Sequence, residues 1–253
     1  MPSLMRTVRA GSLAAVIVLS AAACGSVGSS GSVHSGGTGA SALAGMSADQ
    51  IVQKSVSDLE AASSLRITGS LDDSGEGIAL DLTVVSAGGC QGTITYTASA
   101  SATGSAAMSG SADLIDVDST EYMKFGESLV KNLGLPSSTL ADLNSKYIKM
   151  TSTSDADLAQ MCNPSGLWSV FAHDDTGGFV KTGTATVGGQ PALAFKQQKQ
   201  PGTVYISDSA TPEIVRIAGS ASQGTFDLSD YNAPATITAP PADDVVDGSK
   251  LGI

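Results

Sequence analysis

The sequence has few of the residues on which nucleic-acid binding and most enzyme active sites depend. Its 253 residues include two histidines, one tryptophan and three cysteines, and 13 Lys+Arg stand against 24 Asp+Glu. Nucleic-acid phosphates and anionic lipid headgroups both attract clustered Lys and Arg. The composition therefore excludes nucleic acid as a partner and argues against a basic patch that holds a membrane surface.

Motifs for catalysis are missing or incomplete. The chain has no G-x-S-x-G and no C-x-x-C, and neither His34 nor His173 has a partner at metal-ligand spacing. We interpret His173 as the cap of a helix end, where a cation suits the dipole. We expect no catalytic residues, no metal and no cofactor.

Two short matches to serine β-lactamase motifs are the nearest approach to an enzyme signature. Ser128-Leu129-Val130-Lys131 has the form S-x-x-K, and Lys181-Thr182-Gly183 has the form K-T-G. The third motif, S-D-N, is absent, and too few residues lie between the two matches for a large helical subdomain. We therefore reject β-lactam chemistry.

Asp116, Asp118 and Glu121 have the spacing of calcium ligands. No glycine among them supplies the turn that an EF-hand loop needs. We interpret the three as a solvated strand face.

One segment has the composition of an export signal. Arg6 and Arg9 precede a short apolar stretch, and Ala21-Ala22-Ala23 leads directly into Cys24. This pattern is typical of a secretory signal peptide, and the stretch is shorter than the roughly 20 residues that span a bilayer. The cysteine after small residues resembles the lipobox of bacterial lipoproteins, although Ala21 stands where leucine is usual.

We therefore predict that residues 1–23 are a lipoprotein signal peptide and that Cys24 carries a diacylglyceryl anchor. The protein would lie on the extracytoplasmic face of the cell membrane. The alternative is an ordinary secreted protein that is cut near Ala23. Removal of residues 1–23 leaves 11 Lys+Arg against 24 Asp+Glu, a net charge of −13.

The rest of the chain divides into a tether, one domain and a tail. Residues 24–45 are nearly all Gly, Ser, Ala, Thr and Val, which cannot bury enough apolar surface to order the chain, so we expect a flexible tether. Residues 46–248 make one domain, and residues 249–253 a tail. If Cys24 is acylated, Cys90 and Cys162 remain as an even pair, which favours a disulfide over two free thiols.

Periodicity predicts the first elements of the domain. Met46 to Ser63 has helical spacing, and Ser47 with Gln50 forms a capping box. The period then changes to two, and two alternating runs around a turn at Asp72–Gly77 predict a β-hairpin. Further strands are expected, and Gly188-Gly189 is a hairpin signal between two of them. The predicted strands are Leu65–Leu71, Ile78–Val84, Thr93–Thr97, Leu114–Val117, Tyr122–Phe125, Phe179–Val187, Pro191–Lys196, Thr203–Ser207, Ile214–Ile217 and Gly224–Leu228.

A helical insertion separates the two sets of strands. We expect helices at Glu127–Leu133, at Ser138–Asn144 and within Asp155–His173. Ala98–Ala112 is either a strand with a bare surface or a mobile loop, and Ala233–Pro241 is extended. This order predicts an α+β fold in which helices cover one face of an antiparallel sheet.

Small residues on the strands and a bulky apolar insertion can enclose an apolar cavity. The alternative is that the helices fill the sheet and leave no cavity. Strand alternation and helix faces suggest the following ligand-binding residues: Leu80, Leu82, Val84, Ile94, Tyr96, Tyr122, Leu167, Phe171, Leu193, Phe195, Val204 and Ile206.

Several short stretches together carry a resemblance to a known family. They are the helix Ala48–Ala62 with Leu65-Arg66-Ile67-Thr68-Gly69, Gly89-Cys90 with Cys162, Gly189-Gln190-Pro191-Ala192-Leu193, Tyr205-Ile206-Ser207 and Phe226-Asp227-Leu228-Ser229-Asp230-Tyr231. In this order they resemble the LolA-like lipoproteins of actinobacteria, the group that contains the mycobacterial lipoproteins LppX and LprG.

The resemblance implies a curved antiparallel β half-barrel with an N-terminal helix and a helical insertion packed on its concave face. It also implies that the protein binds acyl chains and moves or presents envelope lipids or glycolipids. We therefore expect a non-catalytic lipid-binding lipoprotein. The alternative is an envelope lipoprotein of the same fold with a filled core, which binds a protein partner or acts as a sensory module.

Overall fold

The computed structural model describes residues 43–73, 76–98, 108–131, 140, 143–150, 162–164, 168, 177–198, 200–219 and 224–250. The chain separates into residues 1–39 and a compact unit of residues 40–253. The signal peptide, Cys24, His173, most of the tether and most of the helical insertion lie outside the described residues, so the expectations about them stay predictions.

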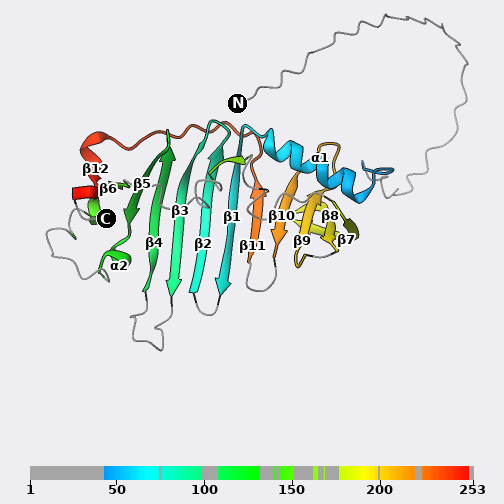
Figure 1. Cartoon of the computed structure of the whole chain (residues 1–253), viewed down its shortest axis with the longest axis horizontal. Helices are drawn as coiled ribbons and strands as arrows, with labels where there is room; N and C mark the ends of the chain where they lie inside the picture. The colour runs from blue at the N-terminus through cyan, green and yellow to red at the C-terminus, as the bar shows by residue number, and fades with distance from the viewer. Residues whose placement is uncertain are drawn as a thin grey trace, which may run out of the picture. The chain divides into compact units, whose positions relative to one another are not determined.

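The compact unit is built on one large curved sheet that does not close (Figure 1). Twelve strands lie in the order β12-β6-β5-β4-β3-β2-β1-β11-β10-β9-β8-β7, and all pairs are antiparallel except β12 with β6. The strands are β1 Ser64–Asp73, β2 Glu76–Val85, β3 Gly89–Ala98, β4 Met108–Val117, β5 Thr120–Phe125, β6 Tyr147–Lys149, β7 Phe179–Val187, β8 Gln190–Gln197, β9 Thr203–Ser207, β10 Ile214–Ala218, β11 Thr225–Ser229 and β12 Val245–Asp247.

Strand alternation gives the sheet one apolar and one polar face. Residues that pair directly across antiparallel strands point to the same side of a sheet. One such row crosses nine strands on the apolar side. A second row, two residues away from the first on each strand, is also apolar. The first row is Phe195, Val204, Ile217, Phe226, Gly69, Leu80, Ile94, Ala112 and Phe125.

The opposite side carries a matching polar row. Its members come from the neighbouring position of each strand and are charged or hydroxyl-bearing. They are Tyr205, Arg216, Asp227, Thr68, Asp81, Thr93, Asp113 and Lys124. We call the two sides the apolar face and the polar face.

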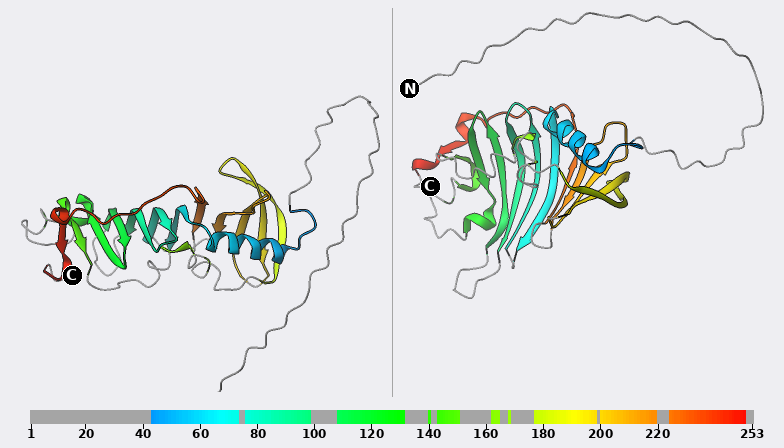
Figure 2. Two further views of the ribbon diagram at one scale, coloured as in Figure 1. Left: turned by 90° about the horizontal axis from the view of Figure 1, so that it is seen from above. Right: turned by 45° about the vertical axis from the view of Figure 1, so that its right-hand side comes forward.

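The N-terminal helix α1 (Ala48–Glu60) packs against the apolar face at the β7–β10 end of the sheet (Figure 2). The predicted capping box is confirmed, because Ser47 Oγ accepts from Gln50 N and Gln50 Oε1 accepts from Ser47 N. The carboxylate of Asp49 accepts a 2.8 Å hydrogen bond from the backbone N–H of Phe179. This bond joins the first turn of the helix to the first residue of β7.

The predicted strands are largely confirmed, with two additions. The β1–β2 hairpin, the β7–β8 hairpin with Gly188 and Gly189 at positive φ, and β9 lie where periodicity places them. The sequence pattern missed β6 and β12, which have three residues each, too few for alternation to be visible. Of the segment 98–112, the part from Met108 onward is strand β4.

Two boundaries need correction or completion. Leu43 was assigned to the tether, but its side chain is buried in the core, so the packed region begins by residue 43. Its large apolar side chain outweighs the small polar residues around it. Helix α2 spans Glu127–Lys131, and the remainder of the predicted helix at 127–133 lies outside the described residues.

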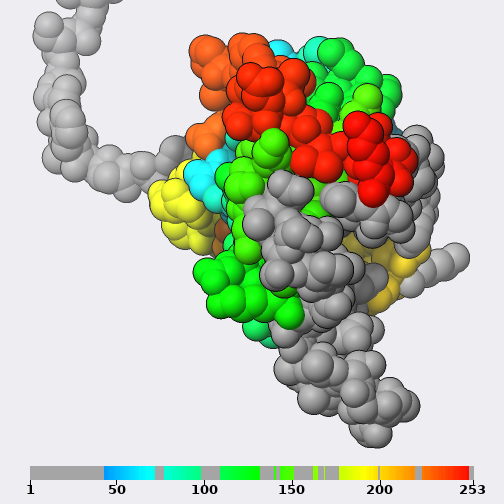
Figure 3. All heavy atoms as spheres, turned by 90° about the vertical axis from the view of Figure 1, so that its left-hand side faces the viewer, coloured from blue at the N-terminus to red at the C-terminus, as the bar shows by residue number. Residues whose placement is uncertain are grey.

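The C-terminal segment connects the middle of the sheet to its edge. It leaves β11, runs along one end of the strands and reaches β12 (Figure 1), which pairs with β6 as the last strand of the sheet and is red in Figure 3. Near its start the Ser64 Oγ donates to the carbonyl oxygen of Ala233 at 2.5 Å, and Ser63 N donates to the side-chain oxygen of Asn232. The predicted stretch Ala233–Pro241 forms no strand and serves as this connection.

Candidate ligand-binding face

Nine of the twelve suggested ligand-binding residues lie together on the apolar face. Eight of them are buried and Tyr96 is half-buried. The nine are Leu80, Leu82, Val84, Ile94, Tyr96, Leu193, Phe195, Val204 and Ile206. Leu167 and Phe171 lie outside the described residues. The alternation of the strands therefore predicted one continuous surface that spans both halves of the sheet.

Tyr122 does not belong to this group. It pairs with Ile115 and Lys149, which places it on the polar face, while the next residue, Met123, is buried on the apolar face. Tyr122 and Met123 are both large and apolar enough to face a core, so the sequence of β5 alone does not show which of the two points to the apolar face. The cross-strand partners of Met123, Leu114 and Ile148, supply the missing signal.

Several side chains cover the apolar face. Leu129 of α2 lies directly over Gly110 of β4, where an added Cβ would come 2.8 Å from Leu129 Cγ. The ring of Phe226 similarly lies over Gly69, where a Cβ would come 2.6 Å from Cδ1. Glycine at these two points lets helix and ring approach the sheet backbone, so small residues on this face are already used for packing.

A disulfide ties a distant part of the chain to the apolar face. Cys90 of β3 is paired with Val84 and lies on that face, and it is joined to Cys162 with their Cα atoms 4.9 Å apart. The backbone N–H of Gly89 also donates to the carbonyl oxygen of Cys162. The bridge thus fixes residue 162 from the helical insertion against the sheet.

Acidic side chains mark one rim of the apolar face. Asp116 pairs with Cys90 on one side and Glu121 on the other, so it lies on the apolar side and not on a solvated strand face as the sequence suggested. Burial raises the pKa of the Asp116 carboxyl above its ordinary value. Asp118 sits in the β4–β5 turn at positive φ. No cluster suited to a metal ion occurs among the residues that the structure describes.

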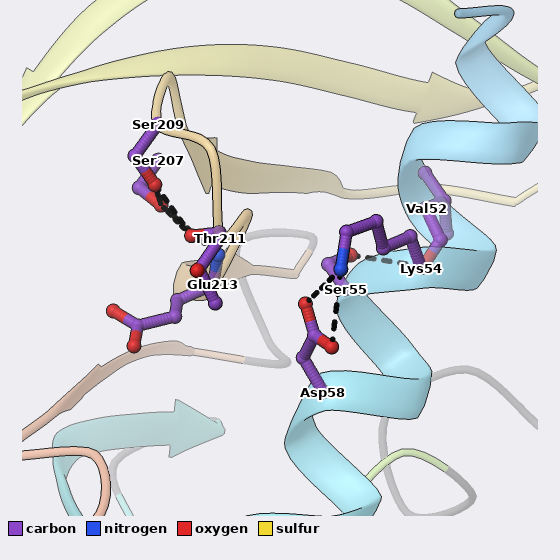
Figure 4. A network of polar contacts seen from close by, with 8 residues as sticks. All are labelled: Val52, Lys54, Ser55, Asp58, Ser207, Ser209, Thr211 and Glu213. Carbon is purple, nitrogen blue, oxygen red and sulfur yellow. Dashed lines mark hydrogen bonds and ion pairs between the residues drawn. The ribbon is translucent and has the colours of Figure 1, made fainter. Parts of the chain in front are cut away.

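Two groups of polar contacts lie near each other, one on α1 and one on the β9–β10 connection (Figure 4). On the helix, Lys54 forms a 2.9 Å ion pair with Asp58. On the connection, the Ser207 Oγ accepts from the backbone N–H of Glu213. Burial raises the pKa of Glu213, and the negative charge of Asp58 raises it further. These groups shape the loop beside the helix and show no pairing of a nucleophile with a base.

The polar face is hollowed where β1 to β4 lie side by side. An open depression of about 660 Å³ is lined by polar side chains that include Arg66, Asp81 and Gln91. Arg66 binds Asp81 through two hydrogen bonds, Nε to Oδ1 at 2.7 Å and Nη2 to Oδ2 at 2.6 Å. This bidentate pair lies across the depression and occupies the charges that would otherwise meet a ligand.

The two β-lactamase-like motifs lie in separate parts of the sheet. Ser128 belongs to α2, which packs on β4, whereas Lys181 belongs to the edge strand β7. Eight strand spacings of about 4.8 Å separate β4 from β7, a path of roughly 38 Å along the sheet. The structure therefore brings no serine–lysine site together from these motifs.

In the described part of the chain, no helix has the length and apolar content to cross a membrane.

Comparison with known proteins adds little. No known protein family matches the sequence, and no curated protein matches it. Among solved structures, the complex of Pseudomonas aeruginosa MucA and MucB is similar to this chain, with 14% sequence identity and a TM-score of 0.29. The match covers 78% of this chain and 59% of that chain, so this chain spans less than two thirds of it. A likeness this low supports no functional statement.

Proposed function

We propose that this protein is a non-catalytic lipoprotein of the cell envelope that binds a lipid or glycolipid against its apolar face. The observation that carries the proposal is the continuous apolar row from Phe195 on β8 to Phe125 on β5. Most residues of the row are buried in one core cluster, and an extended acyl chain that lies along the row would have its CH₂ groups out of water. Each buried CH₂ contributes about 0.8 kcal/mol.

The proposed LolA-like half-barrel gives this face its role. An open sheet with one N-terminal helix on its apolar side is consistent with that family's architecture. The anchor on Cys24 would hold the domain at the membrane, where the exchange of lipid takes place. Transport or presentation of lipid, and not chemistry on it, is what such an arrangement supports.

Native mass spectrometry of the full chain, purified from a lipid-containing host, tests the proposal. We expect a lipid to be retained at one per protein. A matched pair of variants sharpens the test: Ala112→Phe adds a ring to the apolar row between Ile94 and Phe125, and Ser111→Phe adds the same ring on the exposed face. Ala112→Phe should reduce the retained lipid, and Ser111→Phe should leave it unchanged.

The result also separates the proposal from a filled core. In a filled core, Ala112→Phe has no space to occupy and lowers the melting temperature through overpacking, which typically costs about 1–3 kcal/mol. A chain that never carries lipid and whose Ala112→Phe variant is strongly destabilised would overturn the lipid-binding proposal.

A protein-binding role is the second candidate, and one observation favours it. Val130, Leu143 and Ile148 form a separate cluster with at most 1% exposure, and most residues of the apolar row are buried as well, so the chain's own side chains fill much of the apolar face. If the entire face is filled in this way, the domain acts as a docking or sensory module. A pull-down from envelope extracts that retains no specific protein would count against this role.

A further inference from the structure

The single tryptophan of the chain is buried in the core of the apolar face. Trp168 is 3% exposed and packs in the same cluster as the strand residues of that face. Its ring lies 6.3 Å from the ring of Phe179, the first residue of β7, at an interplanar angle of 45°. This is an aromatic pair at ordinary contact distance, which fixes the indole in place.

The indole nitrogen of Trp168 has no hydrogen-bond partner. Among the described residues, Trp168 Nε1 is the one buried side-chain nitrogen or oxygen for which this holds. The indole N–H is a donor only, and burial of a donor without an acceptor is expensive enough that tryptophan is usually placed where its N–H finds one. A phenylalanine would fill an apolar site without this cost. The unused donor therefore points to an acceptor that arrives with a ligand.

The charges around the face decide which acceptor is suitable. Every Lys and Arg on strands β1–β6 and β8–β11 lies on the polar face by register, and Asp116 and Glu121 on the apolar side are acidic. On the edge strand β7, Lys181 pairs with Phe195 and so lies on the apolar side, with its side chain exposed. A carboxylate buried beside Trp168 needs a cation that is buried with it, and on the apolar side the described strands place only the exposed Lys181. A neutral carbonyl needs one donor and no charge.

We propose that Trp168 donates a hydrogen bond from Nε1 to the carbonyl oxygen of a neutral acyl ester bound against the apolar face. This inference rests on the proposed lipid-binding function and narrows its ligand class. The site would prefer esterified acyl chains over ether lipids of the same length, and over free fatty acids, which are ionised at neutral pH. The expected advantage of ester over ether is about three- to tenfold in affinity, the range for one net hydrogen bond.

Because Trp168 is the only tryptophan, its indole N–H gives one signal in a ¹⁵N-labelled full chain. The chain, freed of lipid, is titrated with dioleoylglycerol, with its diether analogue di-O-oleylglycerol, and with oleic acid. We expect the ester to bind most tightly and to move the indole proton downfield, and the diether to bind without that shift. Trp168→Phe should reduce the affinity for the ester to that for the diether.

Phe179→Leu is the matched control, because it disturbs the same aromatic pair and leaves the donor intact, so the ester preference should persist. Equal affinity of the wild-type chain for ester and diether, or an indole proton already hydrogen-bonded in the free chain, would overturn the inference and leave lipid binding standing. Tighter binding of oleic acid than of dioleoylglycerol would overturn the assignment of a neutral ester as the ligand. Binding of neither glycerolipid would overturn the proposed function itself. The comparison on the wild-type chain decides the question even if Trp168→Phe does not fold.

Discussion

The two faces of the sheet are made by the same strands yet differ in what their side chains do. On the apolar face, Leu82 is fully buried and packs with Ile67 and Leu114 in a row across the strands. On the polar face, the adjacent Asp81 is exposed and paired with Arg66. Over β1 to β4, one residue of register separates a core from a solvated surface, so stability there should depend mainly on the apolar face. At the other end of the sheet, Val187, Ala192 and Val215 form a small buried cluster with Tyr205 of the polar row.

Two carboxyls display the contrast in a second way. The hydrogen bond from Arg66 lowers the pKa of Asp81 on the polar face. Burial raises the pKa of Asp116 on the apolar face. The same chemical group is thus stabilised as an anion on one side of the sheet and destabilised as an anion on the other.

Loss of the disulfide should have the largest effect on the apolar face. The Cys90–Cys162 bridge spans 72 residues, and closure of a loop of that length restricts the unfolded chain by about 4 kcal/mol. We expect the double variant Cys90→Ala, Cys162→Ala to lose about that much unfolding free energy, measured by urea denaturation. An unchanged midpoint would show that residue 162 is held to the face without the bridge.

Leu82→Ala should be next in size. Removal of a fully buried leucine typically costs about 3 kcal/mol through lost burial and the cavity left behind. The neighbouring Thr83→Ala, on the polar face, should change the unfolding free energy by less than about 0.5 kcal/mol. Denaturant titration of both variants measures the difference, and equal losses would contradict the division into two faces.

The ion pair on the polar face should contribute little. Asp81 and Arg66 have side chains 50% and 46% exposed, and such pairs typically contribute about 0.2–1 kcal/mol. Because the pKa of Asp81 is lowered in the folded state, its contribution is present above the carboxyl's ordinary value of 3.8 and is lost as pH falls through the lowered one.

Asp81→Asn should therefore destabilise the protein slightly at pH 7, less in 1 M salt, and less again near pH 2, below the carboxyl's ordinary pKa of 3.8. Thermal melts at the two pH values and two salt concentrations measure this. A loss of the same size at pH 2 would show that packing, and not charge, holds Asp81 in place.

Asp116→Asn should have the smallest effect and the opposite sign. A folded-state pKa raised above 3.8 means that ionisation costs stability as pH rises through that range, so the folded protein bears the cost at neutral pH. The asparagine variant should be slightly more stable than the wild type at pH 7 and equal to it in acid. Asp113→Asn, exposed on the polar face of the same strand, is the control. A loss of stability at pH 7 would mean that Asp116 is ionised and paired.

Sequence patterns predicted the local features of the fold because those features depend on neighbouring residues. The capping box at Ser47, the glycine turn at Gly188 and the alternation through Leu80 and Leu82 are each visible within ten residues. Strand order is different. Pairing of β1 with β11, or of β6 with β12, depends on contacts between distant segments, which leave no local signal.

The candidate site was likewise predicted only where local sequence patterns determine it. Alternation found nine residues of one face, whereas the phase of Tyr122 and Met123 required the neighbouring strands. No sequence pattern indicated that Trp168 would be buried with its N–H unpaired, because that depends on which acceptors the fold brings near it. Asp116 was misplaced for the same reason, since its environment is set by Cys90 and Glu121 across the sheet.

The central position of β1 has a consequence for how the chain acquires its structure. One side of β1 pairs with β2, the next strand to be synthesised. The other side pairs with β11, so Arg66 can pair with Ser229 only after β11 has been synthesised. Until then a meander of β1 to β5 has a free edge in what becomes the middle of the sheet. Such an edge can join another chain, and a fold dominated by distant pairings forms slowly. The apolar face is therefore completed only when nearly the whole domain is available, and a partner that shields this edge during synthesis would raise the yield of folded protein.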